Sequence, residues 1–318
     1  MTGPRIAVVG VGGIGGYFGG RLAAAGQDVR FLARGETLAA LRRDGLSVAG
    51  GSTVWSAPHV RVSGDPHEIG EADFVLLCVK TPQLPAAVDA LGPLIGADTA
   101  VVTIQNGVEA PERVAERIGR DRVLPGLVQV VATKIGPAEV RHVGGPGALG
   151  FAEWDGHASR RVLRLREALR DARLASSEPG DIWADMWGKF LLVVPIGSLG
   201  AAADGANIGE LRSRAGTRNL LIAGMREIHD IATALGIALP ANVLDNAIEF
   251  MDRQPAHVTT SLQQDILAGR PSELDAWTGA VVRMAERAGT AAPIHEMLHE
   301  LLAVRVAKAG APQPLKTG

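Results

Sequence analysis

The sequence contains one cysteine and almost no net charge, and both features limit the classes of function that it can have. Its 318 residues include one cysteine, Cys78, so no internal disulfide can form and a reducing, cytoplasmic setting is expected. Cys78 lies in an apolar run, which favours a buried, inert thiol over a nucleophile. Lysine and arginine together number 32 against 34 acidic residues. No stretch collects them into a basic stripe, so nucleic acid is not an expected partner.

The sequence also lacks an uninterrupted run long enough for a membrane span. The longest apolar run, residues 190–203, holds a proline and two glycines and is shorter than the roughly 20 residues that a spanning helix needs. Arg5 precedes a short apolar stretch, but glycines soon interrupt it and no convincing cleavage site follows, so no signal peptide is expected. Hydrophobic residues still make up 47% of the chain. That is enough for full cores, and the length suits two domains.

The first half alternates short β-branched runs with amphipathic stretches. This alternation predicts an α/β domain whose parallel sheet is built from strand–helix–strand units. Short strands with glycine turns over residues 126–154 then predict a hairpin that extends the sheet. The expected strands span residues 5–10, 28–33, 74–79, 100–103 and 122–125, and the expected helices 13–25 and 37–44.

The second half has a different pattern, in which apolar residues recur at helical spacing and strand signals stop. It predicts an all-α domain, with a boundary that divides the chain into residues 1–179 and 180–318. Glycines and prolines mark the ends of the helices. The expected helices span residues 181–194, 210–235, 241–253, 258–268, 273–288 and 293–308.

A glycine-rich motif directly follows the first expected strand. Gly10, Gly12 and Gly15 have the spacing G-x-G-x-x-G and lead into a helix, the arrangement of a Rossmann-type dinucleotide-binding unit. The glycines allow a tight turn, close approach to a pyrophosphate and close packing of helix on strand. The helix N-terminus offers free N–H groups to the phosphates. We therefore expect Gly10, Gly12, Gly13, Ile14 and Gly15 to bind a nicotinamide dinucleotide.

The end of the second strand bears on the choice between NAD and NADP. Enzymes that use NAD tend to place an acidic residue there to hold the ribose 2′-hydroxyl. Here the strand ends at Arg34, whose guanidinium suits the 2′-phosphate of NADP. An exposed arginine with no ligand is the plainer interpretation, and Glu36 nearby leaves NAD open. NADP(H) is the favoured cofactor.

Three further segments carry polar residues where chemistry is expected. Lys80 and Asn106 follow two successive strands at their carboxyl ends, where open α/β sheets bind ligands. Lys189 interrupts a strongly apolar helix. Burial there would lower the pKa of its amine and suit it to proton donation near neutral pH. A lysine whose ammonium reaches the surface along its apolar stem is the alternative. No metal site is predicted.

In their order and spacing these segments resemble the ketopantoate reductase (2-dehydropantoate 2-reductase) family, which pairs a Rossmann domain with a helical domain like that of 6-phosphogluconate dehydrogenase. The resemblance covers essentially the whole chain. Its motifs are Gly10 to Gly20, Lys80, Gln105-Asn106-Gly107, Trp187-x-Lys189, Ser261-x-x-x-Asp265, Ser272-Glu273-Leu274-Asp275 and Ala292-Pro293.

The resemblance implies a role for each matching residue. Lys189 would be the general acid that protonates the carbonyl oxygen as NADPH delivers hydride, in a step of pantothenate biosynthesis. Glu273 would bind the substrate and orient the catalytic site. Asn106 and Lys80 would lie beside the nicotinamide and the substrate, and Ser261 would contact the substrate. From the residues alone, Glu273 stands in a helix cap, with Ser272 at the N-cap and Asp275 at the third helical position.

The sequence departs from the family four and eight residues after Lys189. The family commonly has asparagines there, whereas this chain has Val193 and Gly197. A site without those amides loses discrimination for polar groups on the substrate. Two interpretations remain open, a drifted ketopantoate reductase and a reductase of a less polar or larger 2-oxo acid, ketone or imine. Ser198 or Ser261 could compensate in part for the missing amides.

A third hypothesis is a sensor that binds NADP without turnover, although the presence of both Lys189 and Glu273 argues against it. The expected partner is a small 2-oxo acid or related ketone, with neither nucleic acid nor membrane. The apolar residues of segment 210–235 would serve packing within one chain or between two, so a homodimer through the helical domain stays open.

Overall fold

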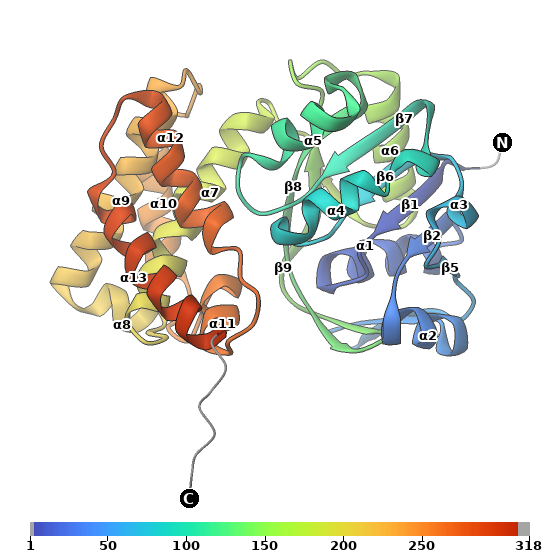
Figure 1. Ribbon diagram of the computed structural model, residues 1–318, viewed down its shortest axis with the longest axis horizontal. Helices are drawn as coiled ribbons and strands as arrows, with labels where there is room; N and C mark the ends of the chain where they lie inside the picture. Colours follow the sequence, from blue (N-terminus) through green and yellow to red (C-terminus); the bar gives the residue numbers. More distant parts are fainter. Residues whose placement is uncertain (1–2, 311–318) are drawn as a thin grey trace, which may run out of the picture. The chain divides into compact units, whose positions relative to one another are not determined.

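The computed structural model describes residues 3–310 and divides the chain into two compact units. Of the described residues, the first unit contains 3–105 and 109–182, and the second contains 106–108 and 183–310. The three-residue segment that follows Gln105 therefore clusters with the helical second unit, although it lies in the middle of the first in sequence. The predicted fold class, an α/β domain followed by a helical one, is confirmed (Figure 1).

Six parallel strands form the main sheet of the first unit, in the spatial order β5-β2-β1-β6-β7-β8. If these six strands alone are numbered in the order of the sequence, their spatial order is 3-2-1-4-5-6, as in a doubly wound nucleotide-binding fold. The direction of winding reverses between β1 and β6, and the carboxyl ends of the strands at such a point are where ligands of these folds bind. The strands are β1 (Arg5–Val9), β2 (Asp28–Leu32), β5 (Arg61–Ser63), β6 (Ala72–Leu77), β7 (Ile95–Thr103) and β8 (Val123–Gly136).

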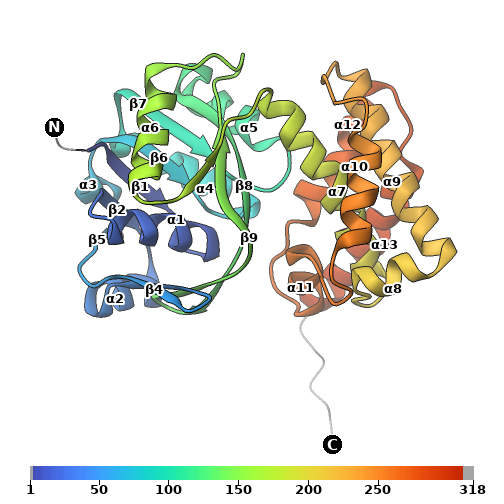
Figure 2. The ribbon, with the colours of Figure 1, turned by 180° about the vertical axis from the view of Figure 1, so that it is seen from behind.

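The predicted hairpin extension is present as β8 paired antiparallel with β9 (Glu139–Phe151). It carries three strands that the sequence pattern missed: β3 (Leu46–Gly50), β4 (Thr53–Ala57) and β10 (Ala175–Ser177). In Figures 1 and 2 the hairpin runs from the main sheet toward β4 and α2. The hairpin therefore lies alongside the second strand–helix pair of the fold.

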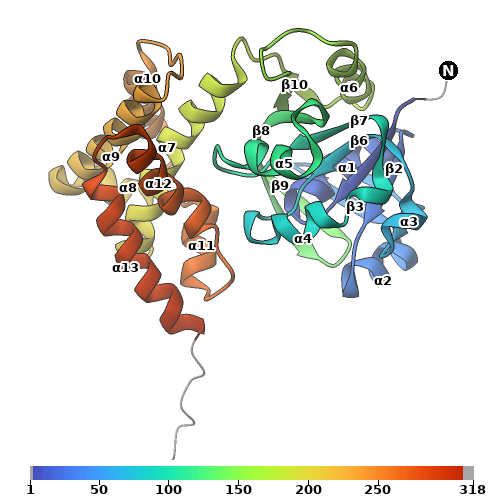
Figure 3. The same cartoon turned by 45° about the horizontal axis from the view of Figure 1, so that its top comes forward.

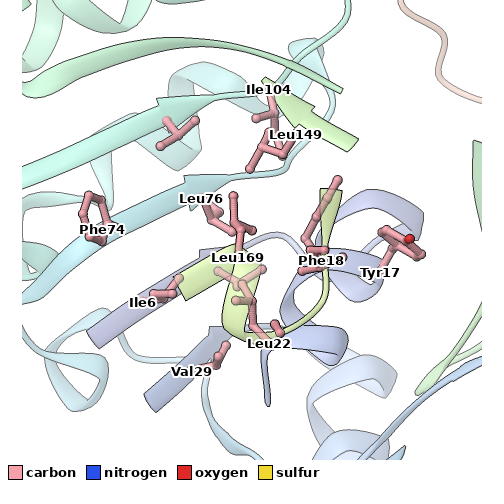
Figure 4. Close-up of a cluster of buried hydrophobic side chains, with 14 of the residues drawn as sticks. Ile6, Tyr17, Phe18, Leu22, Val29, Phe74, Leu76, Ile104, Leu149 and Leu169 are labelled. Atoms are coloured by element: carbon pink, nitrogen blue, oxygen red, sulfur yellow. The ribbon is translucent and has the colours of Figure 1, made fainter. Parts of the chain in front are cut away.

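Side chains that alternate along the strands build two cores, one on each face of the sheet. Ile6 and Val8 belong to one cluster, whereas their neighbours Ala7 and Val9 belong to the other. Figure 4 shows part of the first cluster, where Phe18 and Leu22 meet Ile6, Leu76 and Leu169. The helices are α1 (Gly13–Ala24), α2 (Gly35–Asp44), α3 (Pro66–Ile69), α4 (Leu84–Asp89), α5 (Ala110–Ile118) and α6 (Arg160–Asp171).

Close packing explains several glycines of the turn between β1 and α1. Gly10 has φ +95°, which favours glycine, and a Cβ there would lie 3.0 Å from the backbone nitrogen of Val79. A Cβ on Gly15 would lie 2.0 Å from the carbonyl oxygen of Gly10, and one on Gly13 would lie 2.1 Å from that of Ala132 on β8. Gly12 differs, because nothing lies within 4 Å of its Cβ position. Three glycines are thus required by the protein itself and the fourth faces open space.

The second unit consists of helices, most of them near their predicted places (Figure 3). The capping box of α11 shows why one begins where it does, since the Thr260 hydroxyl accepts from the backbone of Gln263 and the Gln263 side chain accepts from that of Thr260. The helices are α7 (Ile182–Ala202), α8 (Ile208–Ser213), α9 (Ala215–Ala234), α10 (Val243–Arg253), α11 (Ser261–Leu267), α12 (Ala280–Ala288) and α13 (Pro293–Gly310).

Helix α7 is longer than predicted, because it continues past Pro195 to Ala202. Pro195 has no backbone N–H, so one hydrogen bond of the helix is missing. Its ring packs against α9 at Gly224, where an added Cβ would lie 3.3 Å from the ring. Glycine at position 224 therefore leaves room for the proline. With 21 residues, α7 reaches the length and composition of a membrane span, which the sequence pattern had excluded. Of its most apolar window, 67% is buried, as in the core helix of a globular domain.

Two other predicted helices are interrupted. Segment 210–235 breaks at Arg214, which is extended (φ −100°, ψ 126°). The hydroxyl of Thr217 donates to the carbonyls of Leu211 and Arg214, so a side chain replaces backbone bonds at the break. Segment 273–288 opens with a π-helical turn over Asp275–Gly279 before α12 begins. Wide turns of this kind are rare and occur often at functional sites.

We predict that Gly15→Ala destabilises the free protein while Gly12→Ala does not. The added methyl at position 15 meets the backbone of Gly10 and the Cβ of Cys78, which is 2.9 Å away. Such overpacking costs about 1–3 kcal/mol of unfolding free energy. Urea denaturation of the two variants without cofactor measures the difference. Equal stability of both would contradict the packing assigned to Gly15.

Candidate active site

Lys189, Asn106 and Glu273 come together within the second unit, although they are distant in sequence. The Lys189 Nζ donates a hydrogen bond to the Asn106 Oδ1 at 2.9 Å, and the Asn106 Nδ2 donates to the Glu273 Oε2 at 3.4 Å. Lysine can only donate and a carboxylate can only accept, so the two neighbours determine which way the amide points. The Asn106 amide therefore links the ammonium to the carboxylate.

The chain around Asn106 is held by backbone constraints on both sides. The Gln105 side chain donates to the carbonyls of Leu77 and Val79 at 2.7 and 3.0 Å, within the first unit. Gly107 has φ +100°, and a Cβ there would lie 2.9 Å from the carbonyl oxygen of Ala276. Only glycine fits such a place readily. In the Gln-Asn-Gly motif, Gln105 thus anchors the chain, Asn106 joins Lys189 to Glu273, and Gly107 lets the backbone approach the π-helical turn.

Burial lowers the pKa of the Lys189 ammonium. Removal of the charge from water is the larger cause and brings the pKa from 10.5 to about 8, and the negative charge of Glu273 opposes this in part. Such an amine is still mostly protonated at pH 7 and is a stronger acid than an ordinary lysine. The prediction that the apolar helix perturbs this lysine agrees with the structure.

The two positions that depart from the family lie on the same face of α7 as Lys189. Val193 is partly exposed and Gly197 is buried. A Cβ on Gly197 would lie 2.8 Å from the Thr260 hydroxyl oxygen and 3.0 Å from the Cζ3 of Trp277. Position 197 is therefore filled from outside α7 and has no free space for a side chain.

The serines considered as polar substitutes occupy different surroundings. Ser261 is exposed in the first turn of α11, whereas its neighbour Thr260 is the residue beside Gly197. Ser198 is fully buried and shares a 2.7 Å hydrogen bond with the Thr278 hydroxyl. Ser198 therefore stabilises the packing of α7 and has no exposed surface to offer a substrate.

The predicted cap around Glu273 is wrong. The helical backbone begins at Leu274, and no side chain caps the π-helical turn. The Asp275 carboxylate instead accepts a 2.6 Å hydrogen bond from Arg283. Glu273 is buried, with 7% of its surface exposed. Its place is explained by its contact with Asn106 rather than by capping.

The glycine turn of the first unit fits a dinucleotide. Gly12 is the N-cap of α1, with no side-chain cap bond, and faces open space where any Cβ would project. A pyrophosphate can therefore approach the backbone N–H groups at the start of the helix. Ile14 is partly buried against the sheet core. Gly13 serves packing against β8.

Two cations lie near the end of β2, of which the sequence pattern singled out one. Arg34 is exposed at the N-cap of α2. The Lys134 Nζ, from β8, donates to the hydroxyl of Thr37 in the first turn of that helix. The sequence pattern missed Lys134 because the β8–β9 hairpin brings it there from almost 100 positions away. Lys80 is exposed after β6, at the N-cap of the short 3₁₀ helix Thr81–Gln83.

Two surface depressions, of about 800 and 990 Å³, occur elsewhere on the first unit. Asp73 and Asp98, in the amino-terminal halves of β6 and β7, line both depressions together with Arg164 of α6. Ligands of open α/β sheets bind at the carboxyl ends. The Arg164 guanidinium already pairs with the Asp73 carboxylate at 2.7 Å. These depressions are therefore separate from the glycine turn.

Known proteins match nearly the full length of the chain. The model described as "Ketopantoate reductase PanE/ApbA" matches residues 6–156, and "Ketopantoate reductase PanE/ApbA C terminal" matches residues 181–306. A 2-dehydropantoate 2-reductase of Mesorhizobium japonicum is 33% identical over 302 residues, covering 87% of this chain and 90% of that protein.

Solved structures also match nearly the full length of the chain. The crystal structure of 2-dehydropantoate 2-reductase from Geobacter metallireducens is 30% identical with a TM-score of 0.87, covering 94% of this chain and 99% of that one. A ternary structure of D-mandelate dehydrogenase with NADH and anilino(oxo)acetate has a TM-score of 0.85 at 20% identity, covering 96% and 100%. That second likeness shows the fold alone.

We predict that Lys189 titrates near pH 8 in the free protein, and that Glu273→Gln lowers its pKa further. Loss of the carboxylate removes the charge that favours the ammonium, while desolvation remains. NMR of ¹³Cε-labelled lysine measures this, with Lys189→Met to assign the signal. A Lys189 signal that titrates at the ordinary lysine value of 10.5 would contradict the assigned burial.

Proposed function

The chain belongs to the ketopantoate reductase family, and on that premise we propose that it reduces the ketone of a 2-oxo acid to a 2-hydroxy acid with NADPH. The observation that carries the proposal is the hydrogen-bonded series Lys189–Asn106–Glu273. It combines a proton donor of lowered pKa, an oriented amide and a buried carboxylate. The product is 2-hydroxy acid and oxidised cofactor.

Lys189 is the general acid in this proposal. When bound, the reduced nicotinamide cofactor supplies the hydride that the carbonyl carbon accepts. The Lys189 Nζ donates its proton to the carbonyl oxygen, on which negative charge develops. Before the proton moves, the positive charge of the ammonium stabilises that oxygen, and it does so more strongly where water is excluded. A pKa near 8 makes the proton transfer easier than from an ordinary lysine.

Asn106 and Glu273 position the acid. The amide oxygen of Asn106 accepts one Nζ–H of Lys189 and leaves the others free to face a substrate. The Glu273 carboxylate holds the amide in that orientation. Its negative charge also favours the protonated form of Lys189, against the effect of burial. A hydroxyl or amide on the substrate could also donate to Glu273. The carboxylate therefore serves both orientation and binding in our proposal, and Ser261 and Lys80 are further candidates for substrate contact.

The proposed preference for NADPH rests on charge at the end of β2. Arg34 and Lys134 supply two cations beside the first turn of α2, opposed there by Glu36. The ribose of a dinucleotide lies at this strand end in related folds, and a 2′-phosphate would neutralise both cations. Gly10, Gly12 and Gly15 would hold the pyrophosphate.

Two substrates of the same chemical class remain candidates. The names of the family's relatives favour 2-dehydropantoate. The surface of α7 beyond Lys189 favours a less polar 2-oxo acid, because Val193 carries no hydrogen-bonding group and position 197 has no side chain. Steady-state rates with both kinds of acid, followed by NADPH absorbance, decide between them.

We predict that Lys189→Met lowers kcat by about 10²–10⁴-fold, the usual contribution of a general acid. Binding of NADPH should change little, because the residues proposed to hold its pyrophosphate and its 2′-phosphate lie in the first unit. In the unchanged protein, kcat/KM should fall as pH rises through about 8, since the acid must be protonated.

The exposed Lys308 provides a matched control, and Lys308→Met should keep full activity. Turnover of the Lys189 variant at the normal rate would reject the role assigned to this lysine.

We also predict that Arg34→Ala and Lys134→Ala each weaken NADPH binding by about tenfold or more while binding of NADH stays unchanged. A charge-assisted hydrogen bond to phosphate contributes about 1.5–3 kcal/mol, and tenfold in affinity is 1.4 kcal/mol. Fluorescence titration measures both constants. Arg42→Ala, in the last turn of the same helix, is the control. Parallel losses for NADH and NADPH would show that these residues do not read the 2′-phosphate.

A further inference from the structure

We propose that Trp277 is the residue that determines which 2-oxo acids this enzyme accepts, and that it selects compact acids whose group beyond the keto carbon is apolar. The inference rests on the proposed function and adds a specificity-determining residue to it. It depends on three features of the second unit: the spacing along α7, the π-helical turn and the contact between them.

The first feature is the face of α7 that carries Lys189. Val193 and Gly197 follow Lys189 at intervals of four residues, so all three lie on one side of the helix and span about 12 Å along it. Lys189 at one end holds the carbonyl oxygen in the proposed reaction. The rest of a substrate that extends along this face meets Val193 next, and then the region of Gly197.

The second feature is the π-helical turn that follows Glu273. Trp277 comes four residues after Glu273, and its backbone nitrogen donates to the Glu273 carbonyl at 3.0 Å. Residues with this spacing lie on one face of a helical turn. The Trp277 indole lies against α7, because its Cζ3 is 3.0 Å from the place of a Cβ on Gly197. The turn therefore presents a carboxylate near Lys189 and an aromatic ring further along.

The third feature is the close contact between the two elements. The carbon edge of the indole, at Cζ3 and Cε3, lies 3.0 and 3.4 Å from the place of a Cβ on Gly197. The adjacent pair, Ser198 and Thr278, shares a buried hydrogen bond of 2.7 Å. This bond prevents the turn from sliding along α7. The ring consequently occupies the position into which a side chain at residue 197 would project.

In our proposal the result is an apolar boundary at the end of the α7 face remote from Lys189. Val193 and the carbon edge of the indole form this boundary, and 3% of the Trp277 surface remains exposed. The indole Nε1 is buried without a hydrogen-bond partner among the described residues. An unsatisfied buried donor is a cost that structures seldom carry without a reason.

The test compares three acids in the wild-type protein and in Trp277→Leu. They are 2-dehydropantoate, trimethylpyruvate, which is the same acid without its hydroxyl, and the bulkier phenylglyoxylate. Wild-type protein should use trimethylpyruvate with a higher kcat/KM than phenylglyoxylate. Trp277→Leu should raise kcat/KM for phenylglyoxylate relative to trimethylpyruvate by about tenfold or more, within the range that hydrophobic pockets achieve. The Kd for NADPH should stay unchanged.

A second variant covers the case in which Trp277→Leu does not fold. Gly197→Ala places a methyl group against the indole edge and moves the ring toward the substrate, so KM for all three acids should rise, most for phenylglyoxylate. The control is Gly216→Ala on α9, where nothing lies within 4 Å of the new Cβ. That variant should leave both kcat and KM unchanged.

The outcomes separate the two proposals. Absence of turnover with every acid would reject the proposed function and the inference with it. Turnover with unchanged ratios between the acids in both variants would overturn the role of Trp277 alone. A wild-type kcat/KM for phenylglyoxylate equal to or above that for trimethylpyruvate would also overturn it, because the indole would then set no limit on the size of the acid.

Discussion

The two hydrogen bonds of the Asn106 amide are the contacts on which the chemistry of this protein depends. A lysine inside an apolar helix carries a desolvation cost, and its charge persists only if a neighbour compensates. Asn106 accepts from that lysine and donates to Glu273, so one neutral group orients both ionisable ones. The amide is itself held between the anchored Gln105 and the constrained Gly107. The backbone on either side of Asn106 thus determines where its amide lies, and the amide in turn orients the lysine and the carboxylate.

Glycines make the remaining functional geometry possible by removing side chains from close contacts. At Gly10, Gly13 and Gly15 the missing side chain lets backbone meet backbone around the turn that would receive a pyrophosphate. Gly197 works in the same way in the second unit, where it gives room to an aromatic ring. At these four glycines a neighbouring group fills the space where a side chain would otherwise lie. This agrees with the high packing density of protein interiors.

Membership of the ketopantoate reductase family agrees with the proposed acid, amide and carboxylate but does not account for the surface beside them. The acid, its amide and its carboxylate suit the reduction of many 2-oxo acids, because each acts at the carbonyl group that such acids share. In our proposal Val193 and Trp277 lie where one acid differs from another. Chemistry and specificity would then be carried by separate residues, so that one can change while the other is kept.

The sequence by itself determined the fold class, the glycine turn, and the perturbed lysine, because each depends on patterns within a few turns or on spacing along one strand. It did not reveal that α7 continues through Pro195, that the 273–288 helix opens with a π-helical turn, or that β3 and β4 extend the sheet. Only the tertiary structure decided these, and with them the meeting of Asn106 and Glu273 and the place of Trp277. The physical reason is that Gly224 accommodates the proline ring, β9 pairs with β3, and the indole fills the space beside Gly197. Each of these partners is remote in sequence, and no local propensity encodes it.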